Sequence, residues 1–249
     1  MDKAFVKALS LIEALAYSDE SRGVTSLASE LSLTKSNVHR LLSTLERHGY
    51  VQRVAINSTY ELSPKIWELG ARVMEKYDLP RIARPAMEQL AAATGETVHL
   101  SILDRYDVLY IDKIDSEHPV RAYTRVGGRA PAWCVATGKA MLAFQPEDMI
   151  AGLEPLLTPS SKHTIIDLSA LRENFDQIRK TGVAFNNGEW REDVNGIAAP
   201  IYDQRGQVKA AIGVSGPSSR LVKKVMQKFA ADVDLAAKRI SSDPSMSRP

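Results

Sequence analysis

The chain has 249 residues, of which 44% are hydrophobic and 25% are charged, and its formal net charge is +2. This composition is typical of a globular protein with a substantial core, and it excludes a polycation that binds nucleic acid through overall charge. The single cysteine, Cys134, excludes an internal disulfide and favours a reducing compartment. No apolar run approaches the roughly 18 residues that span a bilayer, so we expect a cytoplasmic protein with no membrane partner.

Three helical patterns open the chain. The spacing of apolar residues predicts helices over residues 3–17 and 26–31, with Thr25 as the N-cap of the second. A third helix is predicted to begin after Thr34, which can cap it, and to end near Gly49. These patterns predict a small helical core at the N-terminal end.

Two short β-like runs follow the third helix, at residues 50–54 and 59–62, and Asn57-Ser58 suits the turn between them. Together with the helices, they give the order short helix, tight turn, second helix and hairpin. This order predicts a winged helix-turn-helix domain over residues 1–63.

One face of the third helix is apolar, because Val38, Leu41, Leu42 and Leu45 recur at helical spacing. Residues 34–53 carry four Lys or Arg and one Glu, a local net charge of +3 on the side where phosphates would lie. The opposite face carries Lys, Arg, Ser, Asn and His side chains, which can reach base edges and phosphates. Two alternatives are a solvated helix face of a small α+β domain and a winged helix that binds another protein without contacting DNA. We predict contacts with double-stranded DNA from Thr34, Lys35, Ser36, Asn37, His39, Arg40, Ser43, Arg47, Arg53, Asn57, Ser58 and Tyr60.

A linker helix is predicted over residues 64–76, because Pro64 suits the first turn of a helix. Pro80 and Pro85 follow closely, and they predict a domain boundary near Tyr77. Beyond this boundary the pattern changes to strands mixed with helices.

The second domain is predicted over residues 77–240, and residues 241–249 are predicted to form a disordered tail. Pairs of β-like runs joined by short polar turns predict hairpins, and hairpins imply antiparallel pairing. The predicted fold class is therefore α+β, with helices on a mostly antiparallel sheet. The predicted strands are 97–103, 108–114, 120–124, 196–203 and 208–216, and the predicted helices are 137–144, 168–180 and 219–240.

Motifs for catalysis are weak in this sequence. Gly138-Lys139 is no phosphate loop, because Trp133 and Ala140 stand where that motif needs a Gly and a Ser or Thr. No metal-ligand spacing is present, and we expect neither an enzyme nor a cofactor. Cys134 leaves two alternatives open: a thiol redox sensor, or a cysteine-dependent enzyme that uses the winged helix for protein interaction.

Four segments together resemble the IclR family of bacterial transcription regulators: "VTSLASELSLTKSNVHRLLSTLERHGYV", "YELSPKIWELG", "GGRAPAWCVATGKAMLA" and "GVAFNNGEWREDVNGIAAPIYDQRGQVKAAIGVSGP". The resemblance covers about residues 5–240. It implies an N-terminal winged helix-turn-helix, a linker helix and a C-terminal GAF-like effector domain. It also implies a homodimer or homotetramer that binds a pseudo-palindromic operator and responds to a small-molecule effector, often an organic or aromatic acid.

The resemblance also implies a set of effector-binding residues, and this chain departs from the family's pattern within it. Gly196 stands where Cys is frequent, Gly213 where Ser is frequent, Asn186 where an acid is frequent, and Trp133 where His is frequent. Two glycines remove side-chain volume, and Trp133 offers a flat surface. We therefore predict an enlarged pocket whose effector exceeds a two- or three-carbon keto acid, such as an aromatic carboxylate. The implied pocket residues, with Arg129 and Ser215 as expected anchors, are Gly127, Gly128, Arg129, Trp133, Thr137, Gly138, Asn186, Glu189, Gly196, Ala198, Gly213 and Ser215.

Overall fold

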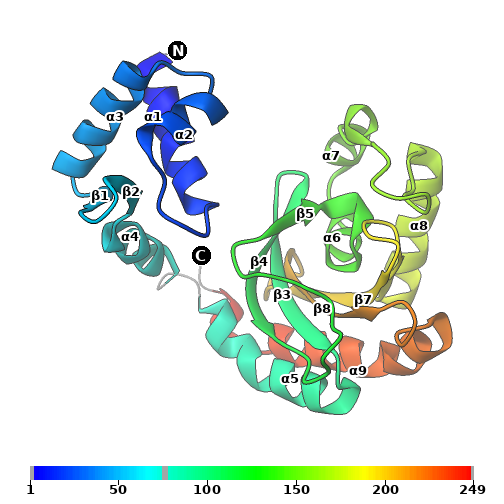
Figure 1. Cartoon of the computed structure of the whole chain (residues 1–249). Coiled ribbons are helices and arrows are strands. Elements are labelled where there is room, and N and C mark those ends of the chain that lie inside the picture. Colours follow the sequence, from blue (N-terminus) through cyan, green and yellow to red (C-terminus); the bar gives the residue numbers. More distant parts are fainter. Residues whose placement is uncertain (1–2, 75–77, 248–249) are drawn as a thin grey trace. The chain divides into compact units, whose positions relative to one another are not determined.

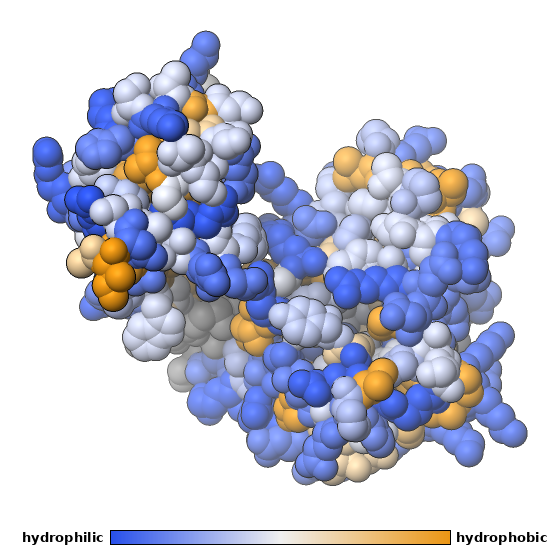
Figure 2. All heavy atoms as spheres, in the orientation of Figure 1, coloured by the Kyte–Doolittle hydropathy of each residue, from blue (hydrophilic) through white to orange (hydrophobic). Residues whose placement is uncertain are grey.

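The computed structural model describes residues 3–74 and 78–247 (Figure 1). The chain divides into two compact units, Met1–Tyr77 and Asp78–Pro249, which we call the N-terminal and C-terminal units. None of the helices in the described ranges combines the length and the apolar character needed to cross a bilayer. On the face drawn in Figure 2, hydrophilic residues predominate and hydrophobic residues lie in small separate groups.

The N-terminal unit packs helices and a β-hairpin around one core. Leu11, Leu27 and Leu42, one from each of the first three helices, are fully buried, and Val51 and Tyr60 close the core from the hairpin. The elements are α1 (Lys3–Ala16), α2 (Val24–Glu30), α3 (Lys35–Arg47), β1 (Val51–Val54), β2 (Thr59–Leu62) and α4 (Pro64–Met74). This order is that of a winged helix-turn-helix.

The ends of these helices show which local predictions hold. The Thr34 hydroxyl accepts a hydrogen bond of 3.3 Å from the backbone N–H of Asn37, so Thr34 caps α3 as predicted. Gly49 follows α3 with a φ of +76°, the left-handed conformation that favours glycine. Thr25 lies inside α2, so its predicted role as an N-cap is wrong.

The C-terminal unit is an α+β domain, which confirms the predicted class. Within residues 78–247, its strands form a six-stranded sheet in the order β5-β4-β3-β8-β7-β6, and every neighbouring pair is antiparallel. The elements are α5 (Leu79–Thr94), β3 (Thr97–Asp104), β4 (Asp107–Ile114), β5 (Arg129–Pro131), α6 (Ala136–Leu142), α7 (Glu147–Ala151), α8 (Leu168–Thr181), β6 (Ala184–Asn187), β7 (Val194–Tyr202), β8 (Val208–Pro217) and α9 (Lys223–Ser241), with 3₁₀ turns at Ala132–Cys134, Glu154–Leu156 and Pro244–Ser247.

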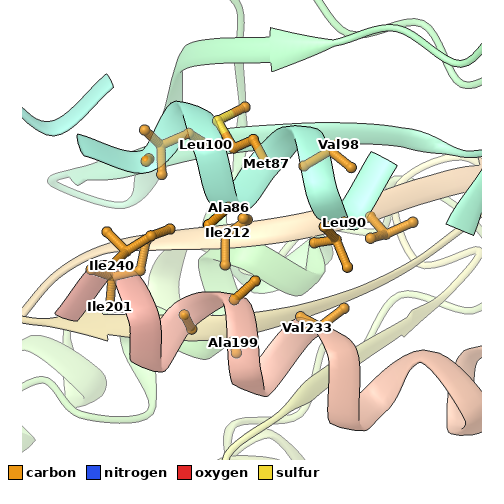
Figure 3. Close-up of a cluster of buried hydrophobic side chains, with 14 of the residues drawn as sticks. Ala86, Met87, Leu90, Val98, Leu100, Ala199, Ile201, Ile212, Val233 and Ile240 are labelled. Carbon is orange, nitrogen blue, oxygen red and sulfur yellow. The ribbon is translucent and has the colours of Figure 1, made fainter. Parts of the chain in front are cut away.

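Both faces of the sheet are covered by helices (Figure 1). Successive side chains of a strand point to opposite faces. On β8, Ile212 and Val214 belong to the core beneath α5 and α9, part of which Figure 3 shows. Ala211 belongs instead to the core on the α6 and α8 side. By the same alternation, His99 on β3 and Ser215 on β8 face α6.

Two segments differ from the sequence prediction because of their neighbours. Residues 120–124 form no strand: the free edge of β4 is taken by β5, and the segment is held by side chains instead, with Lys113 Nζ donating to the Thr124 carbonyl at 2.8 Å. Helix α5 was not predicted, because Pro80 and Pro85 indicated a boundary. Pro80 lies in the first turn, where proline is tolerated, and Pro85 lies inside the helix.

The predicted disordered tail is wrong for residues 241–247. Helix α9 continues to Ser241, and a 3₁₀ turn follows at Pro244–Ser247. Met246 is buried in the core beneath α5 and α9, so this segment gains the apolar burial that a disordered tail lacks. Residues 248–249 lie outside the described residues.

Candidate functional site

Helix α3 presents its polar face to solvent. Val38, Leu41 and Leu42 are buried, which fixes the opposite face outward. Of the predicted DNA-contacting residues on this helix and its cap, Asn37 and Ser43 are half-buried, and the others are exposed: Thr34, Lys35, Ser36, His39, Arg40 and Arg47. These side chains can reach phosphates or base edges without any rearrangement of the core.

The hairpin that follows has the form of a wing. Arg53 donates a hydrogen bond of 3.0 Å to the Ser58 hydroxyl across the hairpin, and both side chains are exposed. Asn57 is exposed at the turn, beside Ile56, whose side chain is 98% exposed. Tyr60 is 3% exposed and packs in the core, so its predicted contact with DNA is wrong.

A cavity that is partly open to solvent lies in the C-terminal unit on the α6 side of the sheet. Its volume is about 30 Å³, room for two or three water molecules at about 10–15 Å³ each. Strands β3, β4, β6, β7 and β8, helix α6 and three connecting segments contribute to its wall. The lining residues are His99, Tyr110, Ala122, Tyr123, Thr124, Val135, Ala136, Thr137, Asn186, Trp190, Arg191, Val194, Gly196, Val214 and Ser215.

Three polar atoms of this wall are buried and have no hydrogen-bond partner within the described residues. They are His99 Nδ1, Thr137 Oγ1 and Ser215 Oγ, from β3, α6 and β8. Leaving a buried donor or acceptor unpaired costs about 1–3 kcal/mol. Bound water or a polar ligand in the cavity can satisfy these three atoms.

The pocket residues implied by the sequence divide into two groups. Thr137, Asn186, Gly196 and Ser215 line the cavity, as predicted. The loop with Gly127, Gly128 and Arg129 does not line it. Arg129 is an exposed residue that forms an ion pair with Asp104, so its predicted role as an anchor for the effector is wrong.

Four further predicted residues serve packing instead. A Cβ on Gly138 would lie 2.1 Å from the Ala132 carbonyl oxygen, so Gly138 permits a close helix approach. Trp133 and Ala198 are buried in the core on the α6 side and do not line the cavity. The space beside Gly213 is filled by Thr137 and His99, whose nearest atoms lie 2.7 and 2.8 Å from the position of a Cβ.

Two of the three arguments for an enlarged pocket, those based on Gly213 and on Trp133, are therefore wrong. Gly213 makes room for protein side chains, and Trp133 lies elsewhere. Gly196 does line the cavity, where a Cβ would lie 3.8 Å from the Ala136 Cβ.

Glu189 is engaged by a buried lysine rather than exposed to the cavity. Lys139 Nζ lies 2.6 and 2.7 Å from the two carboxylate oxygens, and the two side chains are 1% and 6% exposed. Burial lowers the pKa of Lys139 and raises the pKa of Glu189, and each charge opposes the shift of the other. The ion pair ties α6 to the segment that carries Asn186 and Arg191 to the cavity.

Sequence reasoning missed most of the remaining wall. His99, Tyr110, Trp190 and Arg191 carry polar groups or aromatic surface into it. The alternation in "TVHLSIL" could have indicated that His99 shares a strand face with Thr97, both pointing away from the apolar core. Nothing in the local sequence indicates Arg191, because a loop alone positions it.

The structure does not support chemistry at Cys134. Burial raises the pKa of its thiol to about 11, and its Sγ lies 3.8 Å from the Ser160 hydroxyl. The thiolate is the reactive form, so this thiol is poorly suited to redox sensing or nucleophilic attack. The described residues hold no group of three or more His, Cys, Asp or Glu side chains that could bind a metal ion.

Comparison with known proteins gives the same assignment for both units. The family model "IclR helix-turn-helix domain" matches residues 4–55, and "Bacterial transcriptional regulator IclR C-terminal" matches residues 71–242. The chain is 35% identical over 241 residues to the HTH-type transcriptional regulator KdgR of Escherichia coli (strain K12), covering 95% of this chain and 90% of KdgR.

Solved structures share the fold. IclR of Thermotoga maritima aligns with a TM-score of 0.80 at 26% identity, covering 98% of this chain and 99% of that one. An IclR homolog from Microbacterium hydrocarbonoxydans, complexed with 4-hydroxybenzoate, aligns with a TM-score of 0.85 at 23% identity over 98% and 100% of the two chains, a likeness of fold alone. The relatives are named as regulators of transcription and not as enzymes. From its winged helix to its C-terminal domain, the chain belongs to the IclR family of bacterial transcription regulators.

Proposed function

We propose that α3 enters the major groove of an operator while the wing contacts the flanking backbone. The observation that carries this proposal is the exposed face of α3, which places Arg40 and Arg47 opposite the buried residues, with Lys35 exposed at the start of the helix. A recognition helix in this motif reads base edges with its N-terminal residues. Regulation of this kind takes place in the bacterial cytoplasm, where the operator lies.

The working form is proposed to be a homodimer, or a tetramer of two dimers, on a pseudo-palindrome. Helices α1 and α4 support this, because both leave apolar residues in solvent: Leu9 on α1, and Trp67 and Val73 on α4. Exposed apolar groups of this kind suit an interface with a second copy of the chain. Two recognition helices then read half-sites about one helical turn apart, or a multiple of it.

The cavity is proposed to bind the effector. Its three unpaired polar atoms support a polar ligand. A volume of about 30 Å³ holds only two or three water molecules, so any organic acid requires the wall to open, and a three-carbon acid requires a smaller opening than an aromatic one. We therefore favour a small polar acid. An aromatic acid needs a larger displacement of the wall, for instance of residues 122–124 between β4 and β5.

We expect the protein to adopt two arrangements that differ in operator affinity. The effector shifts operator affinity because it binds one of these arrangements more tightly than the other. Such couplings are typically about 1–3 kcal/mol, or 5- to 150-fold in affinity. A shift of this size requires a change in the arrangement of the protein and no unfolding of the C-terminal unit.

The test begins with operators selected from random duplexes by the full-length protein. Fluorescence anisotropy then measures their affinity with and without D-glycerate, pyruvate and 4-hydroxybenzoate. In Gly196→Leu the larger side chain fills the cavity. We therefore expect the response to the active acid to be lost, while operator affinity in the absence of any acid stays as in the wild type. Ala151→Leu, a change at an exposed position on α7, is the control and keeps the response. A normal response in Gly196→Leu would place the effector site elsewhere.

A further inference from the structure

His99 is a buried titratable residue of the cavity wall. It lies on β3, and its ring stacks on that of Tyr110 from β4, with 5.1 Å between centroids and 27° between planes. Gly213, its partner on β8, leaves the space that the imidazole fills. Thr137 of α6 fills the neighbouring part of the same space. The imidazole is therefore held in one orientation by three elements.

Burial leaves this ring neutral at physiological pH, because it lowers the pKa of His99 to about 4. A neutral imidazole offers one donor and one acceptor. Nδ1 is buried, and no group within the described residues forms a hydrogen bond with it. The ring can therefore satisfy a hydroxyl or carbonyl group of a bound molecule.

The charged groups near the ring are already neutralised, with one exception. Lys113, opposite His99 on β4, forms an ion pair with Asp115, and Lys139 of α6 forms one with Glu189. Burial raises the pKa of Tyr110, so its phenol is uncharged. Arg191 is an exposed residue of the cavity wall whose guanidinium lies over the Trp190 ring, 4.7 Å from its centroid, and none of the ion pairs found among the described residues includes it. A ligand carboxylate is therefore best placed at Arg191, with the uncharged end of the ligand toward His99.

We propose that His99 contacts the effector directly and binds a hydroxyl group of a small hydroxy acid whose carboxylate lies at Arg191. This inference rests on the proposed role of the cavity as the effector site. Thr137 and Ser215 supply two further hydroxyls on the same wall, which suits a ligand with more than one hydroxyl. His99 then selects hydroxy acids against plain carboxylic acids of the same length.

The test compares three acids that share a three-carbon chain and a carboxylate: D-glycerate with two hydroxyls, L-lactate with one and propionate with none. Isothermal titration with the full-length wild-type protein should show glycerate binding at least tenfold more tightly than propionate, with lactate between them. In His99→Leu we expect most of the preference for glycerate and lactate over propionate to be lost, with the dissociation constant of propionate unchanged and any remaining preference for glycerate due to Thr137 and Ser215.

Two variants make the result specific. His118→Leu removes an imidazole from an exposed position outside the cavity, and it should keep the wild-type order of affinities. His99→Asn keeps a hydrogen-bonding group near the position of Nδ1 and should keep part of the preference for glycerate. If His99→Leu does not fold, His99→Asn tests the same role of His99.

Each outcome bears on the inference. Equal binding of propionate and glycerate by the wild-type protein, or an unchanged preference in both His99 variants, would overturn the role of His99. Failure of all three acids to bind would overturn the hydroxy-acid class while leaving operator binding, which is measured separately, intact. Binding that survives Gly196→Leu would overturn the cavity as the effector site, and with it the proposed function of this unit.

Discussion

The two candidate sites use the same kinds of side chain in opposite surroundings. On α3, the polar groups of His39 and Arg40 are exposed, so water satisfies them when DNA is absent. Around the cavity, polar atoms of His99, Thr137 and Ser215 are buried, and no described protein group satisfies them. An exposed group without a protein partner costs little, whereas a buried one costs about 1–3 kcal/mol. An unpaired buried group is thus the stronger sign of a ligand.

The sites also differ in how they treat charge. The α3 face leaves its positive charge in solvent, where the phosphates of the proposed operator would neutralise it. The cavity region neutralises its deepest charge within the protein, through Lys139 and Glu189. Loss of a charge should therefore reduce DNA affinity in the N-terminal unit and fold stability in the C-terminal unit.

Lys139→Met gives the largest expected effect, because it leaves the Glu189 carboxylate buried without its cation. We expect the free energy of unfolding of the C-terminal unit to fall by about 3–5 kcal/mol. The measurement is urea unfolding followed by tryptophan fluorescence in a Trp67→Phe background, so that only Trp133 and Trp190 report.

Two comparisons interpret that loss. The double variant Lys139→Met, Glu189→Leu should regain most of the stability, since replacing both members of a buried pair with apolar residues is often neutral. Lys162→Met breaks the exposed pair with Glu192 and should change stability little. If the double variant is no more stable than Lys139→Met, the loss comes from packing and not from an unpaired charge.

The stability of the C-terminal unit should also depend on pH through His99. Its folded pKa of about 4 lies below the ordinary value of 6.5, so between these values the unfolded chain binds a proton that the folded chain excludes. The stabilising contribution is complete above pH 6.5 and falls as the pH decreases toward 4, by about 3 kcal/mol in total. We expect His99→Leu to lose less stability than wild type over this range in the same urea experiment. Parallel curves would show that His99 titrates normally.

The contrast between exposed and buried sites also explains how much the sequence predicts. Helix α3 was predictable because Val38, Leu41 and Leu42 repeat at helical spacing and Thr34 marks its start, which are local signals. The family resemblance implied Thr137 and Gly196 as pocket residues, and both line the cavity, while their contact with an effector stays a prediction. The order of elements and the antiparallel hairpins followed from the same local patterns.

What the sequence did not predict depends on contacts between distant segments. Arg129 was expected in the pocket, but β5 pairs with the edge of β4 and turns this side chain toward Asp104. Tyr60 was expected to contact DNA because it lies on the predicted wing, but β2 directs its side chain into the core. The partner of Glu189 lies 50 residues away, and no local pattern links it to Lys139.

Arg40→Ala tests the exposed site. If Arg40 reads a guanine, we expect operator affinity to fall by about 1–3 kcal/mol and base preference at that position to flatten. Fluorescence anisotropy on matched operator variants measures both. Arg205→Ala removes the same charge from an exposed turn of the C-terminal unit and should leave binding unchanged. An equal loss in both variants would mean that only net charge matters.

Arg53→Ala should have the smallest effect and separates the two kinds of DNA contact within the exposed site. Arg53 lies on the wing, where its guanidinium donates to Ser58 and remains exposed, so we expect it to contact a phosphate and not a base. Loss of one phosphate contact should reduce the slope of log affinity against log salt concentration by about 0.9 and weaken all operator variants equally. Anisotropy titrations from low to moderate salt measure that slope. A change in base preference would instead mean that the wing reads sequence, because phosphate contacts carry no sequence information directly.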